Sequence, residues 1–473
     1  MGLSSVKRPK QQTKALLRRV VGAYAAREPR LGPERWGLEV RGNELLLEGN
    51  SLHRLEQEYG SPLQVVAAQK LRSNARTFLT PPEAGSSACE VYYSYKTNPV
   101  PGVLRFLHEM GVGAEVISHY EFWLARKLGV APERIVYNGP AKSDESIREA
   151  VRLGIQTLNL NHQEEIARVA RIAQEEQKKL RVGVRISVGQ GWEAQFGSPI
   201  ARGQALAAFR EAVQAPWLDV VGLHAHRGGM ILSEAELTAF VDAVLDFVAT
   251  LRSELGLSPQ VLNFGGSLGT PTVKPLSPLD QRLNRTLHRD LSAPDPDAAL
   301  SIERYVALLS KLVRARYATF GAPLPRIFLE PGRSLTGNAQ LLLTSVLSIK
   351  RSDGDAYAIM DAGINHAESV RSEYHQVLAA NHWGEPADQT YTVVGPICSP
   401  GDTLYRAVRL PRLEPGDTLA IMDSGAYFVP FSTSFSFPRP AIVMTDGGDV
   451  SSLRRRETFD DIVCCDQLRA EGS

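Results

Sequence analysis

The stretch Tyr93-Ser94-Tyr95-Lys96-Thr97-Asn98-Pro99 decides how the rest of the chain is interpreted. The apolar and aromatic residues 91–93 predict the end of a buried β-strand, and Pro99 and Pro101 precede a run with helical spacing. Lys96 therefore stands at the carboxyl end of a strand, where α/β enzymes place their chemistry. A desolvated lysine at such a position can form a Schiff base. The alternative is a solvated lysine that only ends a strand.

Composition and charge describe an ordinary globular protein. The 473 residues are 43% hydrophobic and 22% charged, and their number suggests two domains. The net charge of +1 gives no general attraction to nucleic acid or membrane, and no apolar run is long enough to span a bilayer. Cys89, Cys398, Cys464 and Cys465 form neither a disulfide framework nor a zinc pattern, which favours a reducing, cytoplasmic location.

Strand-like and helical runs alternate from residue 91 onward. Apolar strand-like runs are expected at 91–94, 113–118, 134–138, 157–161, 181–187, 219–226, 260–264 and 326–330. Amphipathic helical stretches separate them, which predicts a parallel sheet buried on both faces. Eight such units over roughly 250 residues predict an α/β fold with a closed (βα)8 TIM barrel. A doubly wound open sheet is the structural alternative.

A β-rich second domain is expected at 336–473, where short strand-like runs are divided by Gly, Pro and Asp. A basic extension at 1–35 is either an organelle-targeting peptide or a flexible segment that ends in a short helix around Leu16–Ala26. Residues 36–60 are expected to pair with the β domain, and the barrel is expected at 61–335. The Pro- and Asp-rich stretch 271–298 predicts an inserted loop, either a lid or a disordered segment.

Polar and glycine-rich motifs stand at the ends of other predicted barrel strands. His224 and His226 point to the same side of the sixth strand, where they could bind zinc or where one ring could stack on a flat cofactor. The Phe-Gly-Gly-Ser-Leu-Gly run at 264–269 ends the seventh strand and is either a phosphate loop or a tight turn. Glu330 and Arg333 end the eighth strand. Arg333 suits a phosphate, and Glu330 is a buried carboxylate that needs a cation, which could be Arg333 itself.

A Schiff-base lysine, a phosphate clamp, a stacking imidazole and a carboxylate for a ring nitrogen together suggest pyridoxal phosphate. The chain resembles the fold-type III pyridoxal-phosphate decarboxylases, the group of diaminopimelate, ornithine and arginine decarboxylases, and most of all diaminopimelate decarboxylase. That resemblance implies a barrel of the alanine-racemase-like type and covers roughly residues 36–468. It rests on the motifs at 95–99, 222–226, 265–266, 330–333, 361–363, 395–398, 425–427 and 456–458.

The resemblance implies a role for each matching residue. Lys96 would hold the cofactor, His226 would stack on its ring, and Glu330 would pair with the ring nitrogen. The phosphate would be bound by Gly265, Gly266, Gly332, Arg333 and Tyr427, with Ser267 in place of the third glycine of the family's triplet. Cys398 would protonate the carbanion in the site of the partner subunit, which implies a homodimer. From the sequence alone, Cys398 could also be a small buried residue.

The residues expected to bind the substrate depart from the family pattern. Ser399 stands where an acidic residue usually binds the substrate's distal ammonium, and Asp402 follows three positions later. Arg371 and Tyr374 lie near the pair that grips a distal carboxylate, but one or two positions out of register. Glu115 stands where an aspartate is usual. A missing carboxylate beside a buried ammonium would cost about 2–5 kcal/mol, so an unusual or conjugated amino acid from secondary metabolism is expected.

The predicted activity is therefore the pyridoxal phosphate-dependent α-decarboxylation of an amino acid, a carboxy-lyase reaction, without a metal, nucleic acid or membrane partner. One alternative is a racemase or another carbanion reaction, which needs a second acid–base group on the opposite face of the cofactor. The other alternative is a catalytically inactive regulatory homologue. The presence of Lys96, Glu330, Arg333 and Cys398 argues against an inactive protein.

Overall fold

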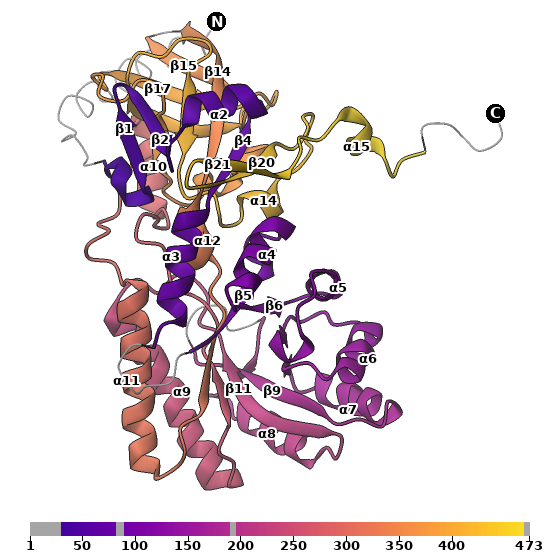
Figure 1. Ribbon diagram of the computed structural model, residues 1–473. Helices are drawn as coiled ribbons and strands as arrows, with labels where there is room; N and C mark the ends of the chain where they lie inside the picture. The colour runs from indigo at the N-terminus through magenta and orange to yellow at the C-terminus, as the bar shows by residue number, and fades with distance from the viewer. Residues whose placement is uncertain (1–29, 82–88, 190–194, 353, 468–473) are drawn as a thin grey trace, which may run out of the picture. The chain divides into compact units, whose positions relative to one another are not determined.

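The computed structural model describes residues 30–81, 89–189, 195–352 and 354–467. The chain forms two compact units, whose elements are labelled in Figure 1. Of the described residues, 71–81, 89–189, 195–271 and 297–337 form the barrel unit, and 30–70, 272–296, 338–352 and 354–467 form the β unit. Within the described residues, no helix is both long and apolar enough to cross a membrane.

Eight parallel strands close into a barrel in the barrel unit. Their order is β11-β12-β13-β5-β6-β7-β8-β9, and pairing of β9 with β11 completes the ring. The closed (βα)8 barrel is thus confirmed, and the open doubly wound sheet is wrong. The strands are β5 Glu90–Ser94, β6 Gly113–Val116, β7 Ile135–Tyr137, β8 Thr157–Leu160, β9 Leu180–Ser187, β11 Leu218–Ala225, β12 Val261–Asn263 and β13 Arg326–Leu329, with the short β10 Ser198–Pro199 beside β9.

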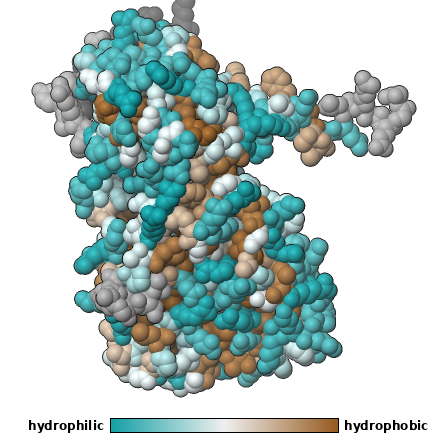
Figure 2. All heavy atoms as spheres, in the orientation of Figure 1, coloured by the Kyte–Doolittle hydropathy of each residue, from teal (hydrophilic) through white to brown (hydrophobic). Residues whose placement is uncertain are grey.

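Amphipathic helices follow the barrel strands. They are α4 Pro101–Glu109, α5 His119–Lys127, α6 Asp144–Leu153, α7 Glu165–Glu175, α8 Gln204–Gln214, α9 Glu234–Leu255 and α11 Ile302–Phe320. In α6, Ser143 caps the first turn, Ile147 and Val151 are buried on one face, and Gly154 ends the helix with a φ of 71°. The outer surfaces of α6 and α7 are mostly hydrophilic (Figure 2), as expected for helices that cover a barrel.

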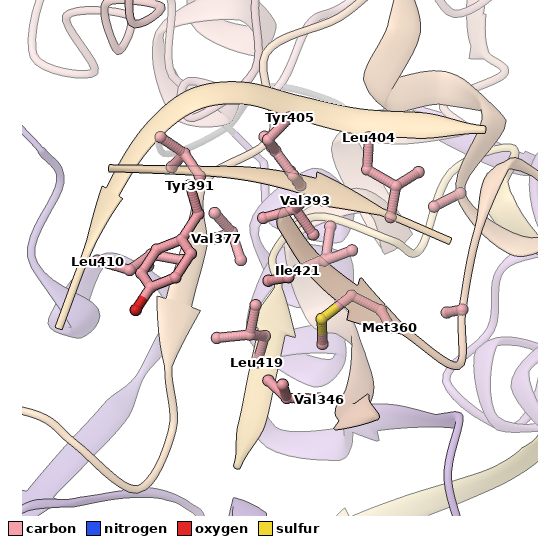
Figure 3. Close-up of a cluster of buried hydrophobic side chains, with 14 of the residues drawn as sticks. Val346, Met360, Val377, Tyr391, Val393, Leu404, Tyr405, Leu410, Leu419 and Ile421 are labelled. Carbon is pink, nitrogen blue, oxygen red and sulfur yellow. The ribbon is translucent and has the colours of Figure 1, made fainter. Parts of the chain in front are cut away.

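A mixed, largely antiparallel sheet organises the β unit. Its order is β18-β17-β15-β14-β4-β20-β21, with β19 beside β14 and β16 beside β19. A buried apolar cluster that includes Val346, Met360, Val393 and Ile421 fills its interior (Figure 3). The strands are β4 Leu63–Ala67, β14 Gln340–Ser352, β15 Asp355–Met360, β16 Val377–Ala379, β17 Gln389–Val394, β18 Thr403–Leu410, β19 Thr418–Ile421, β20 Ala441–Asp446 and β21 Asp449–Arg454.

The N-terminal elements belong to the β unit. β1 Leu38–Arg41 and β2 Glu44–Leu47 form a hairpin that β3 Asn50–Ser51 extends, and α2 Leu52–Tyr59 follows. Apolar residues of the hairpin share one buried cluster with residues of β4 and β14. β4 pairs with β14 and β20, whereas the sequence-based boundary at residue 61 placed it in the barrel domain. The helix expected around Leu16–Ala26 lies outside the described residues.

The inserted stretch 271–298 is not the structureless loop that its composition suggested. It contains the helix α10, Pro278–Leu287, and residues 272–296 belong to the β unit. Ser277 accepts a hydrogen bond from the Asp280 N–H, and Pro278 occupies the first turn, where its missing N–H costs nothing. The high proline and aspartate content therefore marks a helix start in this segment.

Candidate active site at the carboxyl ends of the barrel strands

Lys96 lies in the short 3-10 helix η2, Tyr95–Thr97, directly after β5. The end of β5 is tied to the segment that follows β13. The Ser94 N–H donates to the Pro331 carbonyl at 3.2 Å, and the hydroxyls of Tyr93 and Thr336 are 2.9 Å apart. Lys96 is half-buried, so its position is set by the barrel rather than by the mobility of a surface loop.

The strand order brings the predicted motifs to one end of the barrel. β11, β12, β13 and β5 are consecutive neighbours, and their carboxyl ends lead into His226, Gly265, Glu330 and Lys96 respectively. Parallel strands all present their carboxyl ends on the same side. The chain therefore gathers four residue types that are far apart in sequence at one end of the barrel unit.

Glu330 is a buried carboxylate that faces three polar partners. Its Oε1 accepts hydrogen bonds from the side-chain amides of Asn138 at 2.8 Å and Asn263 at 2.6 Å, and its Oε2 lies 3.4 Å from Nε2 of His224. Burial disfavours the charge, but His224 and the two amides outweigh it and lower the pKa of Glu330 below its usual value. Glu330 is therefore an anion at neutral pH.

His226 is a neutral imidazole. Its Nδ1 accepts a hydrogen bond from the Gly266 N–H at 3.2 Å, so the ring proton is on Nε2. Although the side chain is partly accessible, its deep position and the charges of Lys96 and Arg185 lower its pKa well below the usual range. A neutral flat ring suits stacking on an aromatic cofactor. The described residues contain no group of three or more His, Cys, Asp or Glu side chains that could hold a metal ion.

The glycines after β12 are required by close approaches. A Cβ at Gly265 would collide with the His226 ring, and a Cβ at Gly266 would collide with the Glu330 carbonyl. Ser267 adopts a φ of 72°, the left-handed conformation that glycine favours, where the family's triplet has its third glycine. The serine thus keeps the backbone shape of the loop and adds a hydroxyl 3.5 Å from Nε2 of His226.

The segment after β13 is equally tight. A Cβ at Gly332 would collide with the side chain of Thr97, the neighbour of Lys96. Arg333 begins the short helix α12, Arg333–Thr336, and its carbonyl accepts a hydrogen bond from the Thr270 hydroxyl at 3.3 Å. The loops after β5, β12 and β13 are therefore locked to one another within the barrel unit.

Several members of this site were not predicted from the sequence. They are Ser94, Asn138, Asn159, His224 as a partner of Glu330, and Asn263, all of which are buried. Each is a polar residue at or near the carboxyl end of an otherwise apolar strand. That recurrence was a usable signal, because a buried amide in a barrel strand needs partners.

The loop between β17 and β18 carries Cys398 and Ser399 in the β unit. Cys398 is exposed, so the alternative interpretation as a small buried residue is wrong. Ser399 forms a turn in which its N–H donates to the Ile397 carbonyl at 2.6 Å and its hydroxyl accepts from the Gly401 N–H at 3.3 Å. Tyr427, which precedes the short helix α14 Phe428–Phe431, has a φ of 69° and stacks on Phe431 with ring centroids 6.0 Å apart.

Asp402 differs from its predicted role as a substrate-binding residue. Its side chain is buried, Oδ1 accepts a hydrogen bond from the Ile364 N–H, and Oδ2 accepts one from the Ile397 N–H, both at 2.8 Å. A Cβ at Gly363 or Gly395 would collide with the carboxylate. Both oxygens are thus used to join two loops of the β unit, which makes Asp402 a structural residue.

Arg371 and Tyr374 line one cavity of the β unit with a volume of about 320 Å³. Tyr374 is buried and donates a hydrogen bond to Gln376 Oε1 at 3.1 Å, and Arg371 pairs with Glu368 at 3.0 Å. Other parts of the wall come from α10, β18 and the segment at 400–401. The volume is in the range of small-molecule sites.

Comparisons with known proteins agree with this arrangement. The profile of the family described as "Pyridoxal-dependent decarboxylase, pyridoxal binding domain" matches residues 70–337. Diaminopimelate decarboxylase of Methanothermobacter thermautotrophicus is 30% identical over 433 residues, which cover 89% of this chain and 94% of that protein. The enzyme of the same name from Aquifex aeolicus is 30% identical over 440 residues, with coverages of 90% and 96%. The crystal structure of diaminopimelate decarboxylase from Methanocaldococcus jannaschii matches with a TM-score of 0.80 and 25% identity, and covers 91% and 98% of the two chains.

The chain belongs to the pyridoxal-dependent decarboxylase family. It is a pyridoxal phosphate-dependent carboxy-lyase of the diaminopimelate decarboxylase type, with the barrel and β-rich domain of that group. The prediction of family, cofactor and reaction class from the sequence motifs is therefore confirmed. The racemase and inactive-homologue alternatives receive no support from these relatives.

The residues at the strand ends fit pyridoxal phosphate on structural grounds. The buried polar atoms of the described barrel unit that make no hydrogen bond include Nδ1 of His224, Oγ1 of Thr97 and Oγ of Ser334. Thr97 follows Lys96 in the chain, Ser334 follows Arg333, and His224 lies two residues before His226. A half-buried amine, an anionic carboxylate, a neutral imidazole and close-packed glycines are the groups that an aldehyde, a pyridinium nitrogen, an aromatic ring and a phosphate require.

Proposed function

We propose that this decarboxylase acts on an amino acid whose distal end is acidic or conjugated, not on one that ends in a free ammonium. The cavity of the β unit that contains Arg371 and Tyr374 carries this proposal. Two further arginines, Arg285 and Arg406, line the same cavity. Arg30 lines it too, but faces Asp290 at 3.7 Å. With the arginines in excess over the lining carboxylates of Asp290 and Glu373, the cavity favours an anionic group.

Position 399 supports the same conclusion. The resemblance leads us to expect an acidic residue there for a substrate with a distal ammonium, but Ser399 offers no charge. Its hydroxyl and N–H are engaged in the turn with Ile397 and Gly401. A substrate ammonium would therefore lose a charge-assisted partner at this position. An amide, an ester or another conjugate of the side-chain end carries no such requirement.

We assign a cofactor-binding role to each residue that the resemblance identifies, of which all but Tyr427 belong to the barrel unit. Pyridoxal phosphate, when bound, supplies an electron sink for the electrons left at Cα. Lys96 holds its aldehyde carbon, Glu330 its ring nitrogen and His226 its ring face. The residues assigned to its phosphate are Gly265, Gly266, Ser267, Gly332, Arg333 and Tyr427. Glu330 suits its role because its anionic state is secured by Asn138, Asn263 and His224 before any ligand binds.

Cys398 is proposed as the acid. After CO2 leaves, the Cys398 thiol donates its proton to Cα, and the thiolate is reprotonated from solvent. The exposed loop that carries Cys398 suits a residue that acts in the site of a second copy of the chain, so we propose a homodimer. Mixing Lys96→Ala and Cys398→Ala subunits tests this, because a mixed dimer regains one complete site. We expect recovery of about a quarter of the wild-type rate after random exchange. Two variants that stay inactive together while exchanging subunits would place Cys398 in its own subunit's site.

The substrate proposal is tested by CO2 release from a panel of amino acids. One arm contains diaminopimelate, lysine, ornithine and arginine, each of which carries a free distal cation, accompanied in diaminopimelate by a distal carboxylate. The other arm contains glutamate and conjugates in which the side-chain carboxylate or amine is acylated or esterified. We expect kcat/KM for the second arm to exceed that of the first by at least tenfold. Efficient turnover of diaminopimelate would overturn the altered specificity and leave the decarboxylase activity itself intact.

The contribution of the cavity is tested by a matched pair of variants on α10. Arg285 lines the cavity, and Arg282 on the same exposed helix does not. We expect Arg285→Ala to raise KM for the preferred substrate by about tenfold with little change in kcat, because one ionic contact to a bound anion is lost. Arg282→Ala is expected to leave both constants unchanged. Equal effects of the two substitutions would contradict a role for the cavity.

A further inference from the structure

Two buried carboxyl groups of the barrel share a single amide nitrogen. Nδ2 of Asn138 lies 2.8 Å from Oε1 of Glu115 and 2.8 Å from Oε1 of Glu330, so its two hydrogens are divided between them. Glu115 is on β6, Asn138 follows β7 and Glu330 follows β13. All three side chains are at most 5% exposed. The charge state of either carboxyl therefore acts on the other through one fixed bridge.

The orientation of the bridging amide is fixed by its oxygen. Oδ1 of Asn138 accepts a hydrogen bond from Nδ2 of Asn159 at 2.7 Å, so Nδ2 of Asn138 must face the two carboxyls. Asn159 is in turn seated against Gly183 of β9, where a Cβ would collide with its side-chain oxygen. The bridge is consequently a property of the barrel core and not of a rotating surface side chain.

The two carboxyls are unequally supported. Glu330 has Asn138, Asn263 and His224, whereas Glu115 has Asn138 and the Ser94 hydroxyl, which lies 2.6 Å from its Oε2. Two carboxyls in such contact do not both ionise easily. Burial and the charge of Glu330 raise the pKa of Glu115 to about 7, against the opposing effect of Lys96 and Ser94.

The other charged groups that act on Glu115 do not change which of the two carboxyls is the more easily protonated. Lys96 on η2 and Arg185 on β9 favour its anion, and Glu121 on α5 opposes it. Glu121 is itself a buried carboxyl that accepts a hydrogen bond from the Ile117 N–H at 2.8 Å. It faces Lys96 as Glu115 does, yet its hydrogen bond is to Ile117 and not to the bridging amide. Glu121 is therefore a natural control residue.

We propose that Glu115 holds the shared proton of the carboxyl pair and, through Asn138, sets how strongly Glu330 can bind a positively charged ring nitrogen. The inference rests on the proposed role of Glu330 and extends it to a second carboxyl. Glu115 is thus a positioning residue that acts through Asn138 and Glu330. The contacts accommodate both forms, because the Ser94 hydroxyl donates to Oε2 of the anion and can instead accept from a carboxylic acid O–H, while Oε1 accepts from Asn138 in either form.

The bridge predicts that cofactor binding is coupled to the release of a proton. A cationic nitrogen beside Glu330 adds a positive charge near the pair, which favours the anion of Glu115. Below neutral pH, Glu115 then releases its proton to solvent when the cofactor binds. By linkage, cofactor affinity must rise with pH while Glu115 is protonated in the apoprotein, and this part of the dependence must level off above about pH 7.

The test measures pyridoxal phosphate binding to the apoprotein from pH 5.5 to 8.5, together with proton release by calorimetry in buffers of different ionisation enthalpy. The variants are Glu115→Gln, Glu121→Gln and Glu330→Gln. Glutamine at 115 keeps both hydrogen bonds and cannot titrate. Below pH 7, we expect the Kd of the wild type to fall as the pH rises. The fall should exceed that of Glu115→Gln by up to about tenfold per pH unit. Glu121→Gln is expected to retain the wild-type slope and the additional released proton.

The inference would be overturned if Glu115→Gln showed the same dependence of Kd on pH as the wild type and released the same number of protons on cofactor binding. Equal losses in Glu115→Gln and Glu121→Gln would also overturn it, because a general field effect of buried carboxyls would replace the bridge. Glu330→Gln separates this failure from that of the assigned role, since unchanged cofactor affinity in that variant would remove the role of Glu330 itself. If Glu115→Gln does not fold, Glu115→Asp is the second variant, because its shorter side chain keeps the carboxyl group but moves it away from Asn138. The dependence of Kd on pH is then expected to be weaker than in the wild type, and an unchanged dependence would count against the bridge.

Discussion

The carboxyl ends of the barrel strands and the loop after β17 were both expected to carry functional residues, and they are built differently. At the barrel end, Glu330, Asn138 and Asn263 are buried, and both amides donate hydrogen bonds to Glu330. In the loop after β17, Cys398 and Ser399 are exposed, and the contacts of Ser399 are to its own turn. One region is held by many partners, whereas the other is held by its local backbone.

This difference indicates where substitutions can be tolerated. A change at the barrel end leaves a buried polar group without its hydrogen-bond partner or forces two backbone segments apart. Each lost partner lowers the free energy of unfolding by about 1–3 kcal/mol. A change at the exposed positions Cys398 and Ser399 leaves no buried group without a partner. The residues that we propose for cofactor binding therefore cannot vary independently, while Ser399, which we propose to face the substrate, can change without disturbing the fold.

The largest effect is expected at the barrel end for Lys96→Ala. Removal of the amine abolishes covalent attachment of the cofactor, and we expect kcat/KM to fall by about 10⁴-fold or more. The visible absorbance of the purified protein and the rate of CO2 release measure the two consequences. Lys127→Ala, an exposed lysine on α5, serves as the control. Retained attachment in Lys96→Ala would assign the Schiff base to another lysine.

The corresponding change in the loop, Cys398→Ala, is expected to act on turnover alone. Cofactor attachment and thermal stability stay at the wild-type level, because the thiol is exposed and no buried partner is lost. We expect kcat to fall by about 10²–10⁴-fold, the usual contribution of a positioned acid. Product analysis in deuterated water reports whether Cα is still protonated on one face. A normal rate with normal product would contradict the assigned role.

Glu115→Gln probes the electrostatics of the barrel end in the apoprotein. The pKa of Glu115 in the folded chain, about 7, lies above the usual value of 4.5. Its contribution to stability is therefore fully present below pH 4.5 and is lost as the pH rises through 7, by about 3 kcal/mol at most. Urea unfolding at pH 5 and pH 8 measures this loss. The free energy of unfolding should fall less between these two pH values for Glu115→Gln than for the wild type. Equal losses in both proteins would show that Glu115 does not titrate in this range.

Two glycines sharpen the same comparison through packing. Gly332→Ala forces a Cβ into Thr97, and we expect a loss of about 1–3 kcal/mol in the free energy of unfolding. Gly401→Ala in the loop after β17 has its closest neighbour, the Ser399 hydroxyl, at an ordinary 3.5 Å. Its expected loss is below about 0.5 kcal/mol. Thermal unfolding of the two variants and the wild type measures these losses. Equal losses of stability in the two variants would contradict the difference between the regions.

The barrel end was predictable because its determinants are local in sequence. Alternating apolar runs and helices predicted the eight strands, and the motifs at 95–99 and 330–333 led to the cofactor itself and to the cofactor-binding residues that we propose. The amides were missed because Asn138 and Asn263 act only once β7, β12 and β13 are placed around one barrel. β4 was assigned to the wrong domain because its apolar run is the same for either sheet, and only its pairing with β14 and β20 decides.

Asp402→Asn tests the corrected role of this residue. One carboxylate oxygen becomes an amide nitrogen, so either the Ile364 or the Ile397 N–H loses its acceptor. We expect a loss of about 1–2 kcal/mol in the free energy of unfolding, with KM for the substrate unchanged. Asp388→Asn, at an exposed aspartate of the same unit, should leave the stability unchanged. A raised KM at wild-type stability would instead restore Asp402 as a substrate-binding residue, because a carboxylate that only joins two loops affects folding before it affects affinity.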